Sequence, residues 1–222
     1  NSPTGKTATR EFYEQVIEFA LANHLIVVQD AAHAMLSFDR EPNSFLAVPG
    51  AKEVGVEVHS LSKGFDMIGW RMGWVCGHER IVRAFADVKD NSDSGQFIPI
   101  QKAAAAALDD AEIPQRIRAK YRRRLEKLVA MLERCGFKCS MPGGTYFLYT
   151  PSPKGLSGGP TFENAEAASQ YLITQQSICT VPWDDAGAYL RFSVTYEAAD
   201  EAAEDALMRE TEERLKGIGV VF

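Results

Sequence analysis

Five polar side chains in the first third of the sequence have the types and spacing needed for chemistry on an aldehyde. They are Asp30, Ser60, Ser62, Lys63 and Arg71. A lysine amine can form a Schiff base with an aldehyde, while a guanidinium and hydroxyl groups bind phosphate oxygens. A carboxylate can keep a pyridine nitrogen protonated, so that the ring accepts electrons. Each residue alone is most simply a surface charge, a helix cap or a turn hydroxyl, but together they favour one cofactor site.

The elements that must position these residues alternate between helix and strand over the first 80 positions, which predicts an α/β fold with a mostly parallel sheet. Thr9 can cap a helix whose apolar positions are Phe12, Val16, Phe19 and Ala20. Strands are predicted at 25–28, 54–59 and 69–76. The first is continuously apolar, as in a strand buried on both faces. Because ligands bind beyond the carboxyl ends of parallel strands, Asp30 and Lys63 are well placed.

The pattern changes after a long helix predicted over 114–134, which follows helices predicted at 78–89 and 96–108. Its basic run, 116–127, is predicted to be a solvated helix face. Shorter strands then alternate with polar residues, which indicates a smaller α+β domain. They are predicted at 137–139, 145–149, 178–181 and 189–195, with helices at 164–175 and 198–216. We therefore expect residues 1–118 to be part of a large domain and residues 119–222 to form a small C-terminal domain.

Composition and charge argue against several classes of protein. The 222 residues are 45% hydrophobic and 24% charged, which is ordinary for a globular protein. The net charge of −6 gives no reason to expect a nucleic-acid partner. No apolar run approaches the roughly 20 residues of a membrane span, so no membrane partner is expected. The four cysteines and four histidines show no zinc-binding spacing, so we predict no metal site, free thiols and a cytoplasmic location.

The segment around Lys63 resembles a known motif. The sequence S-L-S-K-G-F at 60–65, followed by G-W-R-M-G at 69–73, is similar to the lysine motif of class I and II aminotransferases of pyridoxal phosphate (PLP) fold type I. Three further segments resemble other motifs of that family and occur in the family's order. They are P-T-G at 3–5, D-A-A-H at 30–33 and Y-L-R-F-S at 189–193. The resemblance covers the whole chain. It implies part of the PLP-binding large domain followed by the small domain, and PLP as cofactor.

Four shorter segments favour one branch, the LL-diaminopimelate aminotransferases and their close relatives. They are V-Q-D-A-A at 28–32, V-P-G-A-K-E at 48–53, D-V-K-D-N at 87–91 and V-P-W-D-D-A-G at 181–187. This resemblance implies amino-group exchange between an amino acid and a 2-oxo acid, here LL-diaminopimelate and 2-oxoglutarate, in lysine or peptidoglycan synthesis. It also implies that the full-length protein is a homodimer.

The resemblance gives a role to each residue of the motif. Lys63 would bind PLP covalently and then move a proton between substrate and cofactor. Asp30 would pair with the pyridine nitrogen. Arg71 and Ser60 would bind the phosphate, with Ser62 as a further candidate, although an internal ion pair is an alternative for Arg71.

Other positions bear on substrate and cofactor. Arg191 would bind the substrate carboxylate, unless a protein carboxylate is its partner. Where the family usually has Asn directly before P-T-G, this chain has Ser2, with Asn1 one place earlier. His33 replaces the family's usual Tyr and would either contact the cofactor's phenolic oxygen or be a core histidine. A weaker hold on that oxygen would alter the preferred reaction.

The resemblance also implies that the N-terminal half of such an enzyme is absent from these 222 residues. We expect an open sheet edge, exposed apolar surface and no activity from the chain alone. Another PLP reaction, such as that of a β-lyase, a decarboxylase or a cyclising lyase, stays open, as does a non-catalytic effector-binding module. A nicotinamide oxidoreductase is disfavoured because no G-x-G-x-x-G follows a strand.

Overall fold

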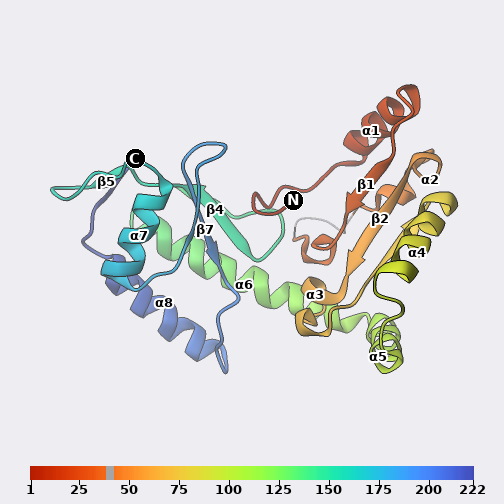
Figure 1. Cartoon of the computed structure of the whole chain (residues 1–222). Helices are drawn as coiled ribbons and strands as arrows, with labels where there is room; N and C mark the ends of the chain where they lie inside the picture. Colours follow the sequence, from red (N-terminus) through yellow and green to blue (C-terminus); the bar gives the residue numbers. More distant parts are fainter. Residues whose placement is uncertain (39–42) are drawn as a thin grey trace. The chain divides into compact units, whose positions relative to one another are not determined.

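The computed structural model describes residues 1–38 and 43–222, which form two compact units (Figure 1). One unit is Thr7–Ala119, and the other combines Asn1–Lys6 with Lys120–Phe222. Division of the full-length protein into domains at residues 118 and 119 stays a prediction. None of the helices in the described residues has the length and apolar character that a membrane crossing requires.

A three-stranded sheet lies at the centre of the unit Thr7–Ala119. Its strands, in spatial order, are β1 (Val27–Asp30), β2 (Gly55–Ser60) and β3 (Gly73–Gly77). β1 and β2 are parallel, as predicted, whereas β3 runs antiparallel to β2. Between β2 and β3 the chain forms only the short helices α3 (Leu61–Gly64) and η3 (Ile68–Trp70). This part of the sheet is therefore mixed, because the link contains no long crossover helix.

Helix α1 (Arg10–Ala22) begins as predicted but packs through a different face. The Thr9 hydroxyl accepts a hydrogen bond from the Phe12 N–H at 3.2 Å, so the cap is confirmed. Its buried residues are Tyr13, Ile17 and Ala20. Phe12 and Phe19 are 54% and 62% exposed, so the predicted apolar face is wrong at these two positions, whereas Val16 is half-buried and Ala20 is buried. Apolar residues lie on two sides of this helix, and spacing alone does not identify the side that meets the sheet.

The sheet of this unit has an open edge. β1 is the end strand of the three, and Val28 is 61% exposed. The prediction that residues 25–28 are buried on both faces is therefore wrong for this chain. Ile26 and Val58 are also exposed, which agrees with the predicted apolar surface. Within this unit, none of the described strands pairs with the outer edge of β1.

The remaining helices of this unit are α2 (Ala51–Val54), α4 (Glu79–Ser92) and α5 (Ile98–Leu108). α4 and α5 match the helices predicted over 78–89 and 96–108. Ala104 of α5 packs in a small core with Leu61 and Phe65. These two residues flank the segment that carries Lys63, so this core holds both ends of that segment.

The second unit has an antiparallel sheet with helices packed on it. Its strands are β4 (Phe147–Pro151), β7 (Tyr189–Ser193) and β6 (Val181–Trp183), in that order, with a separate pair of β5 (Gly155–Leu156) and β8 (Val220–Val221). Its helices are α6 (Glu112–Arg134, from Lys120 onward), α7 (Ala165–Gln176) and α8 (Glu201–Leu215). The strand predicted at 137–139 is absent. Phe137 is buried against the edge of Phe192, so its apolar character reflects packing rather than strand pairing.

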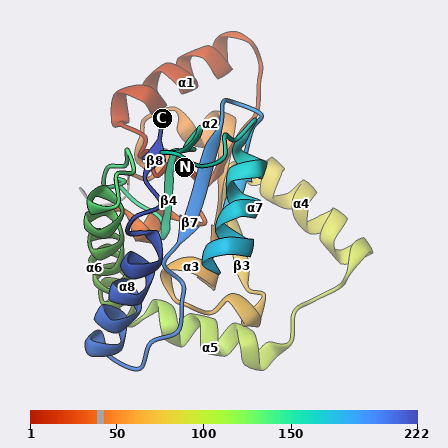
Figure 2. The ribbon, with the colours of Figure 1, turned by 90° about the vertical axis from the view of Figure 1, so that its left-hand side faces the viewer.

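Helices α6 and α8 lie side by side (Figure 2) and are joined by a buried ion cluster. Arg124 of the basic run has a side chain only 7% exposed, so the predicted solvated face is wrong at this position. Its Nε donates to Glu204 Oε1 at 2.7 Å, and its Nη1 donates to the carbonyls of Val194 and Tyr196. Burial opposes ionisation of Glu204, but hydrogen bonds from Arg123 and Arg124 lower its pKa to about 2. Glu204 lies 80 residues from Arg124 in the sequence, so local patterning gave no sign of the pair.

Candidate active site

The ends of β1 and β2 bring Asp30 close to the lysine segment. Asp30 pairs in register with Val58, and the N–H of Ala31 donates to the Val58 carbonyl at 2.9 Å. Ser60 ends β2, and Lys63 follows in α3. The two parallel strands thus deliver the carboxylate and the amine at the same edge of the sheet, as predicted.

The turn that carries Lys63 is fixed by packing and hydrogen bonds. The N–H of Leu61 donates to the Met72 carbonyl at 3.1 Å, and Leu61 is fully buried. A Cβ atom on Gly64 would lie 2.5 Å from the Met35 Cβ, so glycine is required there. Lys63 itself is half-buried. Its amine is therefore attached to a backbone with little freedom to shift.

Ser60 caps this turn. Its Oγ accepts a hydrogen bond from the Ser62 N–H at 3.0 Å. This is the turn-hydroxyl role expected as the alternative, yet the O–H of Ser60 can still donate to a ligand oxygen. Ser62 is buried, so Ser60 is the better placed of the two hydroxyls for a phosphate.

Asp30 and His33 differ in exposure. Asp30 is exposed, and its Oδ1 accepts a hydrogen bond from the Ala32 N–H at 3.0 Å. Its Oδ2 accepts none from the described residues. His33 is half-buried, and burial, followed by the charge of Lys63, lowers its pKa to about 4. His33 is therefore neutral at pH 7, and a neutral imidazole carries one ring N–H.

Arg71 is held in an unusual backbone conformation. Its φ of 53° and ψ of 48° lie in the left-handed region, which costs a non-glycine residue about 1–3 kcal/mol. The guanidinium Nη1 donates to the Ile68 carbonyl at 2.9 Å. Among the described residues no carboxylate lies within ion-pair distance of Arg71, so the alternative of an internal ion pair is not observed. The remaining N–H groups suit a phosphate.

Asn1, Ser2 and Arg191 belong to the other compact unit. The side chain of Asn1 accepts a hydrogen bond from the Thr4 hydroxyl at 2.8 Å, and Ser2 is exposed. Gly5 follows with a φ of 68°. Their roles as contacts to a cofactor stay predictions.

Arg191 occupies the central strand of the β4–β7–β6 sheet. It pairs in register with Tyr149 on one side and Val181 on the other. The guanidinium carbon lies 4.2 Å from the ring centroid of Phe147 and 5.9 Å from that of Trp183. Within the described part of the chain it has no carboxylate partner, although it is half-buried. A cation in this setting is poised to bind an anion.

The aromatic rings around Arg191 were not predicted from the sequence. Phe147, Tyr149, Tyr189 and Arg191 occupy alternate positions of two paired strands, and Tyr149 stacks on Tyr189 at 4.5 Å. The alternation along each strand was a usable signal. The register that joins the two strands was not visible in the sequence.

Comparison with known proteins supplies the family. A family model for aminotransferase class I and II matches residues 1–207. The chain belongs to the class I and II aminotransferase family. The match includes both the lysine segment and the strand that carries Arg191.

Several relatives of this aminotransferase chain belong to the branch that the shorter segments favoured. LL-diaminopimelate aminotransferase of Methanocaldococcus jannaschii is 52% identical over 230 aligned residues, which cover 100% of this chain and 55% of that protein. The enzyme of the same name from Methanococcus maripaludis is 50% identical, again over 100% of this chain and 55% of that protein. The chain therefore spans about half the length of these relatives.

Solved aminotransferase-fold structures match as well. Substrate-bound BacF from Bacillus subtilis has a TM-score of 0.88 and 30% identity, and the match covers 100% of this chain and 55% of that chain. A double mutant of Thermus thermophilus aspartate aminotransferase has a TM-score of 0.81 and 26% identity, with 96% and 53% covered. The chain therefore has the fold of part of a PLP fold type I aminotransferase.

Proposed function

We propose that the full-length protein is a PLP-dependent aminotransferase that moves an amino group between an amino acid and a 2-oxo acid. The observation that carries the proposal is the set of side chains at the ends of β1 and β2. A lysine, a carboxylate, a cap hydroxyl and an arginine without a carboxylate partner among the described residues gather there. Family membership gives independent support.

The chemistry of these donors fits PLP. Arg71 and Ser60 offer N–H and O–H donors for a phosphate, and Lys63 offers a primary amine for an aldehyde. One oxygen of Asp30 stays available for a protonated ring nitrogen, since Oδ1 alone caps the following turn. When bound, PLP supplies the electron sink for a carbanion at the substrate Cα.

The protein's own groups would carry out binding and proton transfer. The Lys63 amine would move a proton at the substrate Cα, acting as general acid and base. Asp30 would hold the proton on the ring nitrogen. His33, neutral because its pKa is lowered to about 4, would donate its N–H to the phenolic oxygen in place of a tyrosine hydroxyl. Asn1 and Ser2 would be further contacts near that oxygen.

Arg191 would bind the α-carboxylate of the substrate. A guanidinium forms two parallel hydrogen bonds with a carboxylate, which fixes orientation as well as charge. Phe147 and Trp183 support this role because their rings flank the guanidinium without neutralising it. In the described residues no acidic side chain competes for this position.

The proposed substrates are LL-diaminopimelate and 2-oxoglutarate, in lysine or peptidoglycan synthesis. The support is the name of the relatives, which are 50–52% identical to this chain. A homodimeric assembly and a cytoplasmic location belong to the same proposal. The four free cysteines are compatible with a reducing compartment.

The test is to treat the full-length protein with PLP, reduce it with borohydride and map the labelled peptide. We expect the adduct on Lys63 and none in Lys63→Ala, while Lys52→Ala serves as a control because Lys52 is an exposed lysine of the same unit. An adduct on another lysine, or none, would remove the cofactor assignment. Glutamate formation from LL-diaminopimelate and 2-oxoglutarate then tests the substrates. Loss of the amino group as ammonia would indicate a lyase instead.

The isolated 222-residue chain provides a second comparison. We expect it to form little or no adduct and to show no turnover, because its relatives are nearly twice as long. Turnover by the chain alone would contradict this expectation.

A further inference from the structure

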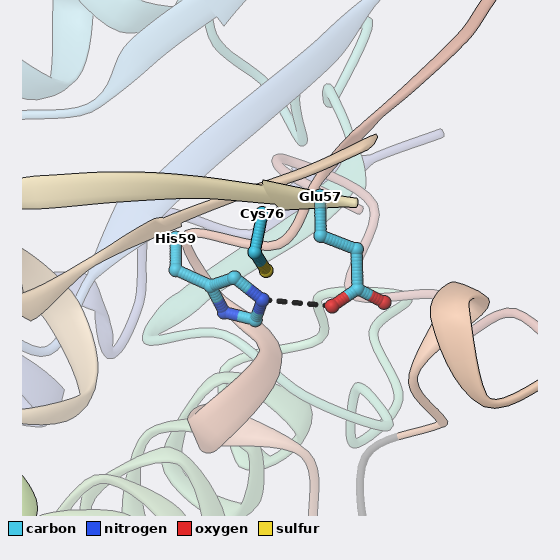
Figure 3. A group of neighbouring side chains, drawn as sticks. All are labelled: Glu57, His59 and Cys76. Carbon is cyan, nitrogen blue, oxygen red and sulfur yellow. Dashed lines mark hydrogen bonds and ion pairs between the residues drawn. The ribbon is translucent and has the colours of Figure 1, made fainter. Parts of the chain in front are cut away.

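Glu57, His59 and Cys76 meet on one face of the β2–β3 pair (Figure 3). Glu57 and His59 are two residues apart on β2, so their side chains point the same way. Cys76 of β3 lies directly opposite Glu57 in the antiparallel register. One ligand atom from each residue lies within 4.8 Å of the other two. This group is separate from the side chains assigned to PLP.

Glu57 is a buried carboxylate held mainly by hydrogen bonds. It is buried, and its carboxylate accepts hydrogen bonds from the Ser44 hydroxyl at 2.8 Å and the Leu46 N–H at 3.1 Å. Its Oε2 lies 2.8 Å from His59 Nε2. Burial acts to raise the pKa of Glu57, but the hydrogen bonds from Ser44, His59 and Leu46 outweigh it and lower the pKa. Among the described residues, no lysine or arginine lies within ion-pair distance of this carboxylate.

The other two donors are constrained and partly accessible. The His59 ring stacks on Trp74, with centroids 5.1 Å apart and planes within 7°. This stacking fixes the orientation of the imidazole. Cys76 is half-buried and forms no disulfide. Burial, and after it the charge of Glu57, raises the pKa of the Cys76 thiol, so the sulfur carries a proton in the absence of a cation.

We propose that Glu57, His59 and Cys76 bind a divalent metal ion of the zinc class. Carboxylate, imidazole and thiolate are ligands that Zn²⁺ prefers, and three protein ligands leave a fourth position for water. Bonds of about 2.0–2.3 Å in a tetrahedron place ligand atoms about 3.3–3.8 Å apart, so the side chains need only small shifts. When the metal–sulfur bond forms, the thiol proton leaves to solvent, and no electron is transferred. Two negative ligands then balance the two charges of the metal.

The prediction of no metal site missed this group because its ligands are not spaced as a local metal motif. Cys76 is 19 residues from Glu57 and comes opposite it only through strand pairing. A search for C-x-x-C or paired histidines therefore misses it. The site does not depend on the proposed aminotransferase function, since it uses none of the residues assigned there.

The test is a titration of the reduced full-length protein with Co²⁺, without PLP. We expect a sulfur-to-cobalt charge-transfer band that saturates at one ion per chain and that Zn²⁺ abolishes by displacement. Cys76→Ser should remove the band and weaken Zn²⁺ binding about tenfold or more, because loss of a direct ligand costs at least as much as loss of an outer-shell partner. Cys135→Ser is the matched control because Cys135 is also half-buried, and Cys179→Ser controls for the exposed thiol. Both controls should keep the band.

A second variant keeps the proposal testable if Cys76→Ser does not fold. His59→Phe keeps an aromatic ring for stacking on Trp74 but removes the nitrogen donor. Because Glu57 loses a hydrogen bond in this variant, the urea midpoint should fall, but unfolding should stay a single cooperative transition. The folded variant should bind Co²⁺ about tenfold or more weakly. Absence of the band in the parent protein overturns the proposal. A band that survives in Cys76→Ser, or unchanged affinity in His59→Phe, overturns it as well. Neither readout requires PLP or turnover, so failure here is distinguishable from failure of the proposed function.

Discussion

Two arginines in the same compact unit, Arg124 and Arg191, are both withdrawn from water but are partnered in opposite ways. Arg124 donates to the carboxylate of Glu204 and to two backbone carbonyls. Arg191 lies over the Phe147 ring and has no carboxylate partner in the described residues. A buried cation with a full set of acceptors holds the fold together, whereas a half-buried cation without an anion is available to a ligand.

The contrast extends to the other unit. Arg71, in a strained left-handed conformation, donates to one carbonyl and pairs with no carboxylate of the described chain. Strain persists where the surrounding structure imposes it, and it is often found at ligand-binding positions. Arg71 and Arg191 thus both have guanidinium N–H groups that no described carboxylate accepts from, whereas the guanidinium of Arg124 is paired with Glu204 and has a structural role.

The largest effect should come from removing the partnered cation. Arg124→Leu removes the buried donor of Glu204 and leaves it with the more exposed cations Arg123 and Lys127. Breaking a buried pair in this way costs up to about 3–5 kcal/mol. Urea unfolding followed by circular dichroism measures the loss. Replacing both partners, as in Arg124→Leu with Glu204→Leu, should recover much of the stability because no buried charge is left alone. If the double variant is as unstable as the single one, packing rather than charge explains the cost.

Acid should weaken the same cluster. The folded-state pKa of Glu204 is about 2, below its ordinary value of 4.5. The stabilisation is thus fully present above about pH 4.5 and is lost as the pH falls toward 2, and it amounts to at most about 3 kcal/mol. The measurement is the free energy of unfolding between pH 6 and pH 2. The profile of Glu204→Gln should be flatter than that of the parent, and parallel profiles would contradict the assignment.

Arg191 should behave in the opposite way to Arg124. Arg191→Leu removes a cation whose described contacts are aromatic, so the stability should change by less than about 1 kcal/mol. In the full-length protein, kcat/KM for amino transfer should fall about 30-fold or more, because a charge-assisted carboxylate contact is lost. Arg191→Lys, which keeps the charge but loses the paired geometry, should be intermediate. A stability loss as large as that of Arg124→Leu would show that Arg191 also has a structural role.

Much of the site and of the fold could be predicted from sequence. The lysine segment follows β2, Asp30 ends β1, the Thr9 cap begins α1, and the helix predicted from residue 164 is α7. These features are local, since each depends on residues within a few positions of one another. Short sequence motifs are therefore enough to predict them.

What could not be predicted depends on contacts between distant segments. The buried face of α1, the pairing of Arg124 with Glu204 and the approach of Cys76 to Glu57 are set by packing and strand register. Periodicity shows that a helix has apolar positions but not which side meets the sheet. A basic run likewise does not show which of its residues forms an ion pair with an acidic residue of another helix.

Arg134 provides the smallest and most closely matched test of the comparison. It lies on α6 like Arg124, and it too pairs with a glutamate of α8, since its Nε and Nη2 donate to the two oxygens of Glu212. The difference is exposure, because the Arg134 side chain is 56% exposed. Water and salt screen an ion pair at such a position, and the free side chains recover conformational entropy when it breaks. Arg134→Leu should leave the urea midpoint within error of the parent, although the helix pair and the chemistry are the same as for Arg124→Leu. A loss comparable to that of Arg124→Leu would mean that pairing between the two helices, rather than burial of the charge, determines the stability.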